Sequence, residues 1–264
     1  MSYNKSIRHR RSRTPHQPAF RLAIMPAMLT AAPGYANGAG AVEGGVVAAG
    51  IGTIATQGAK TTINQATDRM VVNWNNFDIA RDQSVAFNQP SATSAVLNRV
   101  TTAAAPTQID GALTANGRVF VVNPSGVMFG KTSQVNVGSL VASTLNVDSQ
   151  KFMDGGEPVT GIMNLSANGG QGVVSNDGQI NAREAVVLLG AQATNQGTIR
   201  AKDITLGAAD GVAMQMNGSG FKVMLGREAQ NALAAHQGRW FGHRQPEPER
   251  EPGSDERFGQ PRRH

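Results

Sequence analysis

Paired carboxylates remain possible candidates for acid–base chemistry in the central region of the chain, residues 37–226. This region contains neither histidine nor cysteine, which excludes a His-based zinc site, a Ser-His-Asp triad and a cysteine nucleophile there. The five histidines all lie outside it: His9, His16, His236, His243 and His264. Asp78 and Asp82 are four residues apart, and a glycosidase would have to hold such a pair about 5–9.5 Å apart across a cleft. We therefore expect no enzyme and no catalytic residues, with a glycan-active protein as the alternative.

The glycine-rich stretches do not match known ligand-binding loops. Residues 169–177 (GGQGVVSND) contain the glycines of a calcium-binding repeat but lack its Asp at the fixed position. The Gly/Ala-rich stretch 37–58 has neither the Lys-Ser/Thr end of a phosphate loop nor the helix that such a loop opens. We therefore predict no bound metal and no cofactor.

The positive charge belongs to the N-terminal leader. The chain has a formal net charge of +6, with 24 basic and 18 acidic residues. Residues 1–36 hold six of the basic residues and no acid, so the rest of the chain is neutral. This distribution excludes a nucleic-acid-binding surface in the body, because such a surface needs a basic stripe.

The leader itself has the pattern of a secretory signal peptide. A basic segment that ends at Arg21 is followed by an apolar stretch, Leu22–Ala32, and by small residues at Gly34 and Ala36. The apolar stretch is too short to span a bilayer. We predict a signal peptide over residues 1–36, a folded domain over 37–226 and a disordered Pro/Arg/Glu-rich tail over 227–264, in which 228–236 could form a short helix. With no cysteine in the chain, packing alone must stabilise the domain.

An internal repeat runs through the second half of the body. SNDGQINA (175–182) aligns with TNQGTIRA (194–201) at an offset of 19 residues. The apolar runs that follow, 185–191 and 203–209, align at an offset of 17 once a gap is allowed. A period near 19 with one Asn-x-Gly corner and two short strands is typical of a solenoid coil. We predict an all-β fold, a single-stranded right-handed parallel β-helix of about eight or nine coils, with an antiparallel sandwich as the alternative.

Two local segments refine this prediction. In GRVFVVNPSGVMFG (117–130), Asn123, Pro124 and Gly126 occupy the first, second and fourth positions of a type I turn. A hairpin would favour a primed turn, so we expect the chain to bend here and carry on, as at the corner of a coil. The open end of a β solenoid must be covered, and the apolar residues 40–54 are the candidate for an N-terminal β cap.

Several ordered motifs in the body are similar to those of one known family. They are GGVVAAGIGTI (44–54), the Asn73-Trp74-x-x-Phe77-x-Ile79 pattern, Leu97-Asn98-Arg99-Val100, the stretch 109–117, the Asn123–Gly126 corner and VASTLNV (141–147). Together they make residues 42–216 resemble the two-partner secretion domain, also called the filamentous haemagglutinin N-terminal domain. The family's corner usually reads Asn-Pro-Asn-Gly, and Ser125 replaces the second Asn here. Ser fits the third position of a type I turn, so we expect the fold to tolerate it.

The resemblance implies a transport role. Such domains reach the periplasm, bind the periplasmic docking modules of a cognate outer-membrane β-barrel transporter, cross in an extended form and fold outside the cell. The membrane is thus a partner only during export from a Gram-negative bacterium. The family motifs map transporter recognition or fold nucleation onto nine residues: Asn73, Trp74, Phe77, Asn98, Arg99, Asn123, Pro124, Ser125 and Gly126.

Each of these residues also has a purely structural interpretation. Trp74 and Phe77 would be core or cap residues, Asn98 would satisfy backbone groups, and Arg99 would be a surface or Asp-paired charge. A further hypothesis is adhesion, through a host-surface receptor or a glycan. Trp74 is the only tryptophan in the body, so no obvious platform for sugars is present. We therefore expect the secretion module of an adhesin-like exoprotein, with a glycan-binding or glycan-active extracellular β-helix as the alternative.

Overall fold

The structure is a computed structural model that describes residues 42–102, 104–156, 161–167, 171–218 and 220–225. The predicted signal peptide (1–36) and the predicted tail (227–264) lie outside the described residues.

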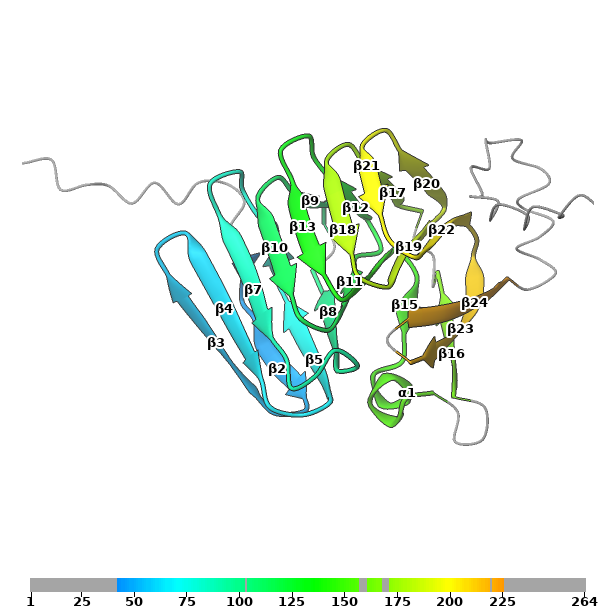
Figure 1. The fold of residues 1–264 in the computed structure, drawn as a ribbon, viewed down its shortest axis with the longest axis horizontal. Helices are drawn as coiled ribbons and strands as arrows, with labels where there is room; N and C mark the ends of the chain where they lie inside the picture. Colours follow the sequence, from blue (N-terminus) through cyan, green and yellow to red (C-terminus); the bar gives the residue numbers. More distant parts are fainter. Residues whose placement is uncertain (1–41, 103, 157–160, 168–170, 219, 226–264) are drawn as a thin grey trace, which may run out of the picture. The chain divides into compact units, whose positions relative to one another are not determined.

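Three mainly parallel sheets form the body, and the chain visits them in turn (Figure 1). Sheet 1 contains β4 (Lys60–Gln65), β7 (Ser84–Asn88), β10 (Ala112–Ala115), β13 (Gln134–Val137), β18 (Gln179–Ala182) and β21 (Thr198–Arg200). Sheet 2 contains β5 (Arg69–Trp74), β8 (Ala95–Val100), β11 (Arg118–Val122), β14 (Ser139–Ser143), β19 (Ala185–Gly190) and β22 (Asp203–Ala208). Sheet 3 contains β9 (Thr107–Ile109), β12 (Gly126–Phe129), β17 (Val173–Asn176) and β20 (Gln192–Asn195). This parallel β-helix confirms the predicted fold class.

The β-helix is shorter than predicted. Sheets 1 and 2 each contain six parallel strands within the described residues, so the estimate of eight or nine coils was wrong. The difference arises because part of the body is used elsewhere. Helix α1 (Ser149–Asp154) and the antiparallel sheet 4 lie outside the coil. Sheet 4 consists of β15 (Asn146–Val147), β16 (Ile162–Ser166), β23 (Gly211–Asn217) and β24 (Gly220–Leu225).

The 19-residue repeat sets the register of two sheets. Ile180 pairs with Ile199, and Asn176 pairs with Asn195, whose Oδ1 accepts a hydrogen bond from Asn176 Nδ2 at 2.7 Å. The second predicted alignment was wrong, because β19 and β22 pair at an offset of 18 residues. An offset of 17 would place Leu206, which packs inside the coil, over Leu189, which points out of it. A slip by one residue reverses the face of every side chain, so the core decides the register.

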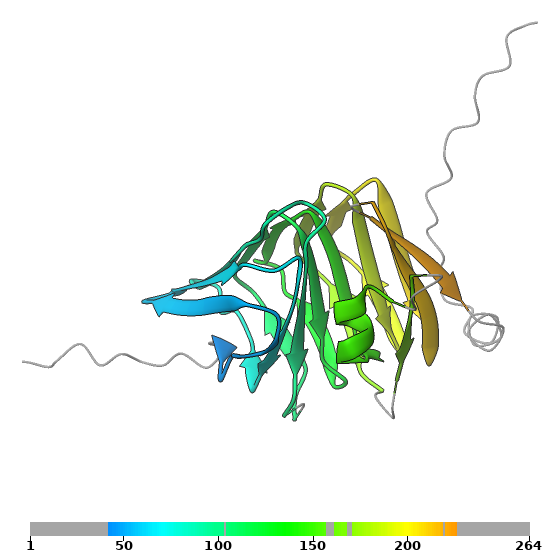
Figure 2. The same cartoon turned by 90° about the horizontal axis from the view of Figure 1, so that it is seen from below.

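Sheet 2 is buried on both faces. Val119 and Val121 of β11 point into the coil, whereas Phe120 and Val122 belong to a second apolar cluster outside it. Helix α1 and sheet 4 cover this outer cluster (Figure 2), and the Phe120 and Phe152 rings meet edge to face with 5.1 Å between centroids. Burial on both faces explains why the sequence of β11 is continuously apolar instead of alternating.

Three short strands close the N-terminal end. β2 (Val46–Ala49) pairs antiparallel with β5, β3 (Gly52–Gln57) pairs antiparallel with β4, and β1 (Val42–Glu43) pairs with β6 (Asn76–Phe77). A two-residue turn joins β3 to β4, and its Gly58 has a φ of 57°, as primed hairpin turns require. The predicted N-terminal β cap is therefore confirmed, and it extends to Gln57.

Candidate functional site

Trp74 and Asn98 lie together inside the coil. Trp74 is 1% exposed and donates from Nε1 to Asn98 Oδ1 at 3.0 Å. Asn98 is fully buried and donates from Nδ2 to the carbonyl oxygen of Phe120 at 3.1 Å. The amide thus links three successive strands of sheet 2 through polar groups that burial would otherwise leave unsatisfied.

Aromatic packing joins Trp74 to the N-terminal cap. The Trp74 and Phe77 ring centroids are 5.2 Å apart, and Phe77 also lies near Phe87. A Cβ atom on Gly45 would approach the Trp74 ring to 2.4 Å, so the cap can sit here only because residue 45 has no side chain. Both predicted aromatic residues are core and cap residues in the folded domain, and neither offers a surface to a partner.

Asn73 and Arg99 point the other way, out of the coil. They are register partners on neighbouring strands of sheet 2 and are half-buried. Arg99 donates from Nε to Asn146 Oδ1 at 2.9 Å, from Nη1 to Ser149 Oγ at 2.8 Å, and from Nη2 to the Val147 carbonyl oxygen.

Arg99 therefore connects the coil to the segment that enters α1. Burial lowers the pKa of its guanidinium from the ordinary value, and the nearby Asp148 carboxylate opposes this effect. The sequence predicts Arg99 as a surface or Asp-paired charge, whereas the structure shows a half-buried guanidinium whose hydrogen bonds go to amide, hydroxyl and carbonyl oxygens.

The Asn123–Gly126 corner turns the chain from sheet 2 into sheet 3. Gly126 N donates to the Asn123 carbonyl oxygen at 2.9 Å, which closes the four-residue turn, and β12 continues in the next sheet. The side chain of Asn123 is 1% exposed: its Oδ1 accepts from Ser125 N, and its Nδ2 donates to the Ala105 carbonyl oxygen and to Thr107 Oγ1. The predicted corner is thus observed, with its Asn holding two coils together.

The exposed part of the corner is small. Pro124 and Ser125 are half-buried, whereas Gly126 is buried at a φ of 127°. A Cβ atom on Gly126 would lie 2.7 Å from the Val173 carbonyl oxygen, so the next coil also requires glycine here. Of the nine predicted residues, only Asn73, Arg99, Pro124 and Ser125 retain appreciable surface.

The nine residues do not form one site. Asn73, Trp74, Asn98 and Arg99 share sheet 2, and the Phe77 ring packs at a tilt against Trp74. Residues 123–126 lie instead at the corner between sheet 2 and sheet 3. Within each group, the contacts are those that assemble coils. Most of the nine side chains are therefore taken up by contacts inside the folded domain.

Sequence reasoning missed Arg69 and Arg118. Arg118 is 4% exposed beneath sheet 4, donates from Nη1 to Met216 Sδ at 3.2 Å, and lies 5.9 Å from the Phe221 ring centroid. Burial and the nearby Arg69 lower its pKa from the ordinary value. Arg69 reaches the end of α1, where Nη1 donates to the Met153 carbonyl oxygen at 3.4 Å. No local pattern marks such residues, because their partners lie far along the chain.

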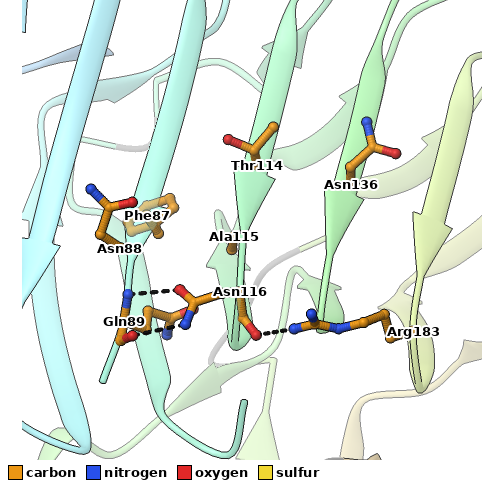
Figure 3. A pocket seen from close by; sticks show the side chains of 8 residues that line it. All are labelled: Phe87, Asn88, Gln89, Thr114, Ala115, Asn116, Asn136 and Arg183. Atoms are coloured by element: carbon orange, nitrogen blue, oxygen red, sulfur yellow. Dashed lines mark hydrogen bonds between the residues drawn. The ribbon is translucent and has the colours of Figure 1, made fainter. Parts of the chain in front are cut away.

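A shallow hollow of about 490 Å³ lies on the outer face of sheet 1 (Figure 3). Asn116 bonds through its side chain to the backbone of Gln89, and its carbonyl oxygen accepts from Arg183. Four of the eight residues that line the hollow carry side-chain amides, and none carries a carboxylate. The candidate carboxylates lie elsewhere: Asp78 Oδ1 accepts from Gln108 N at 2.7 Å, a structural role.

The described residues hold neither a group of metal ligands nor a membrane-spanning helix. No three His, Cys, Asp or Glu side chains gather there in a way that could hold a metal ion. Nor does that part of the chain contain a helix with the length and apolar character of a membrane span.

Comparison with known proteins identifies the family of this chain. The pattern of the TPS secretion domain matches residues 41–239. The heme/hemopexin-binding protein of Haemophilus influenzae strain Rd is 32% identical over 209 residues, which are 77% of this chain and 23% of that protein. A second Haemophilus influenzae heme/hemopexin-binding protein is 39% identical over 93 residues, 35% of this chain and 10% of that one.

A solved structure shows the same fold. The HMW1 secretion domain from Haemophilus influenzae superposes with a TM-score of 0.62 at 26% identity, covering 71% of this chain and 49% of that one. The chain spans less than a quarter of the length of the two curated relatives. TPS secretion domains are transport modules that work with a cognate outer-membrane transporter, and they are not a known enzyme family. Since the family pattern covers most of its length, this chain belongs to the TPS secretion domain family of two-partner secretion.

Proposed function

We propose that this chain is the secretion module of a filamentous-haemagglutinin-like exoprotein, and that its transporter reads the family motifs before the domain folds. Residues 1–36 would direct the chain to the periplasm, where the docking modules of the transporter would bind it. The β-helix would then form outside the cell.

The proposal that recognition precedes folding rests on one observation: the motif side chains are buried in the folded domain. Trp74, Asn98 and Asn123 are at most 1% exposed, and their polar atoms already have partners inside the coil. A transporter could reach them only on an extended chain. An extended segment can add a strand to an exposed sheet edge, which gives affinity through backbone hydrogen bonds and specificity through alternate side chains.

Burial also suggests what happens after translocation. Each coil supplies the template for the next, so folding outside the cell would proceed coil by coil and oppose return. Asn98 and Asn123 each connect neighbouring coils through side-chain hydrogen bonds. The same residues would therefore serve recognition when extended and assembly when folded.

The test is secretion with and without the cognate transporter. We expect the full chain in the medium only when the transporter is present. Asn123→Ala should abolish release, while Ile180→Ala, which weakens the core outside the motifs, should leave entry into the transporter intact. Binding of the urea-unfolded variants to the isolated docking modules separates the two effects. Equal release without a transporter would contradict the transport role. Equal binding by both variants would contradict recognition of the corner.

A second candidate function is binding of a host protein outside the cell. It is favoured by the name of two relatives, heme/hemopexin-binding protein, although the matched region is a minor part of each. A pull-down of the folded chain with hemopexin, with and without heme, tests it. Retention of hemopexin would support a binding role, and no retention would leave transport as the function of this region. Adhesion to a host glycan is tested in the same way on fixed erythrocytes.

A further inference from the structure

The outward-facing positions of the six parallel strands of sheet 1 carry no acidic side chain. Inward and outward residues alternate along each strand, and the buried Ile63, Leu113 and Ile180 identify the inward set. The outward positions of β4, β7, β10, β13, β18 and β21 hold hydroxyl, amide and small side chains together with two basic ones, Lys60 and Arg200. This face is therefore polar and carries a positive charge.

Arg183, which follows β18, brings a third cation to the hollow on this face (Figure 3). Its side chain crosses the strand that continues through Gly138, and Nη2 donates to the Asn116 carbonyl oxygen. A Cβ atom on Gly138 would approach the Gly117 carbonyl oxygen to 2.5 Å, so only glycine fits there. No side chain of residue 138 therefore separates Arg183 from the amides of the hollow.

Arg183 has no ion-pair partner in the described part of the chain. The neighbouring Glu184 already accepts from Lys202 Nζ through both carboxylate oxygens, at 3.0 and 2.9 Å. The residues that line the hollow include no Asp or Glu. Arg183 is exposed, and its remaining N–H groups can donate charge-assisted hydrogen bonds to a carboxylate from outside the chain.

Amide side chains in the hollow offer further donors and acceptors. Asn136 Oδ1 accepts from Asn181 Nδ2 at 3.2 Å, which leaves Asn136 Nδ2 without a partner among the described residues. Asn88 Nδ2 donates to Asn64 Oδ1 at 2.8 Å, which leaves Asn88 Oδ1 in the same state. Thr114 is exposed on the strand between them. Amides and hydroxyls of this kind can both donate to and accept from sugar hydroxyls.

The spacing of the strands favours a sugar chain over other polymers. Neighbouring strands lie about 4.7–4.9 Å apart, which is close to the length of one pyranose unit in an extended oligosaccharide. A nucleic acid strand would need exposed aromatic rings, and the aromatic residue of the hollow, Phe87, is 2% exposed.

A protein partner is disfavoured because this face lacks an apolar anchor. The exposed large apolar side chains of the described residues all lie outside sheet 1: Val46, Ile51, Met128, Val173 and Ile204. A carboxylated sugar needs no such anchor, since a guanidinium and several amides recognise it through hydrogen bonds.

We infer that the hollow on the outer face of sheet 1 binds a carboxylated oligosaccharide. Arg183 holds the carboxylate of one sugar, and Asn88, Thr114 and Asn136 bond to the hydroxyls of that sugar and its neighbour. The inference rests on the glycan alternative of the proposed function and narrows it to one class of sugar and one face. It does not depend on transport, because it concerns the folded domain.

Titration of the purified full chain with two matched pairs of oligosaccharides tests this inference. Tetragalacturonate is paired with its neutral methyl ester, and a hyaluronan tetrasaccharide with neutral chitotetraose. At least one acidic sugar should bind at least about tenfold more tightly than its neutral counterpart, and added salt should weaken that binding. The two pairs also separate a plant or microbial uronate from one of the animal matrix.

Three results of the titration would overturn the inference. One is no saturable binding of either acidic sugar up to about 10 mM. Another is equal binding of each acidic sugar and its neutral counterpart. The third is equally tight binding of polyglutamate, which would mean that the hollow recognises carboxylates without a sugar.

Matched variants locate the site. Arg183→Gln should weaken binding of the acidic sugar at least about tenfold, and Asn136→Asp should do the same by placing a carboxylate in the hollow. An Asp at residue 136 can still accept from Asn181, so circular dichroism should show an unchanged fold. Lys222→Gln and Asn164→Asp make the same changes at exposed positions of sheet 4 and should leave binding unchanged. Equal losses in both pairs, or no loss in Arg183→Gln, would overturn the inference.

Adhesion to fixed erythrocytes separates this site from glycan adhesion as a whole. If Arg183→Gln adheres as well as the unchanged chain, glycan adhesion stands but uses another face, and the inference fails. If the chain does not adhere while an acidic tetrasaccharide still binds through Arg183, the inference stands and erythrocytes are not the target. A failure of secretion affects neither result, because both use purified chain.

Discussion

The two ends of the β-helix differ in how their terminal strands pair and in how deeply their inward-facing side chains are buried. At the N-terminal end, β2 and β3 reverse direction and pair antiparallel with β5 and β4. At the C-terminal end, β20, β21 and β22 run parallel to their neighbours and end their sheets within the described residues. Beneath the N-terminal cap, Ile63 and Met70 are fully buried, whereas Ile199 and Leu206 at the other end are not.

The N-terminal end of the solenoid is closed by strands that are close in sequence. Because β3 and β4 form a hairpin, their pairing costs little loop-closure entropy. Glycines let it approach the core, since a Cβ on Gly45 would meet Trp74 and one on Gly52 would meet Met70 Sδ. We therefore expect the N-terminal end to be the more stable of the two.

The largest expected effect is at the N-terminal end. Trp74→Ala removes an aromatic side chain that touches the cap, Phe77 and Asn98, and should lower the free energy of unfolding by about 3–5 kcal/mol. Urea denaturation measures this loss. Ile54→Ala, in the half-buried outer layer of the cap, is the control and should cost far less. Similar losses for both variants would mean that Trp74 contributes no more to stability than a half-buried residue of the cap.

A matched pair of isoleucines compares the interior with the C-terminal end. Ile180→Ala should cost about 2–4 kcal/mol, because Ile180 is fully buried. Ile199→Ala, one coil further on, should cost about 1 kcal/mol, because part of its side chain is already hydrated. Urea denaturation measures both losses. Equal losses would mean that Ile199 is as deeply buried as Ile180.

The asparagine ladder gives a smaller contrast. Asn176→Ala should cost about 1–3 kcal/mol, because it removes a fully buried amide that bonds to Asn195 Oδ1 and accepts from Gly178 N. Asn195→Ala should cost about 0.5 kcal/mol, since Asn195 is exposed and water can replace its bonds. Thermal unfolding of the two variants side by side checks this order. The reverse order would mean that Asn195 contributes more to stability than its exposure indicates.

The smallest effect concerns the ion pair between the last two coils. Lys202 Nζ lies 2.9 Å from Glu184 Oε2, and the Lys202 side chain is 69% exposed. Lys202→Ala should therefore change the free energy of unfolding by less than about 0.5 kcal/mol, and added salt should remove even that. A larger loss that survives high salt would show that something shields the pair from solvent.

Several features were predictable from local sequence. The Asn123–Gly126 corner follows from turn preferences within four residues, and the 19-residue repeat follows from Asn and Ile residues that stack directly on one another. The β cap follows from the apolar residues near 46–54. These features depend on interactions between chain neighbours or between adjacent coils, so the pattern of residue types is enough to indicate them.

Other features depended on tertiary contacts. Arg99 bonds to Ser149, 50 residues away, and Arg118 to Met216, 98 residues away, and neither pairing has a local signal. The number of coils was overestimated because β15, α1, β16, β23 and β24 leave the solenoid and lie over the apolar outer face of sheet 2. The sequence by itself determined the β-helix, its repeat, its corner and its N-terminal cap. Only the tertiary structure decided how many coils form and which faces are covered, because burying Phe120 and its neighbours requires partners that come from distant parts of the chain.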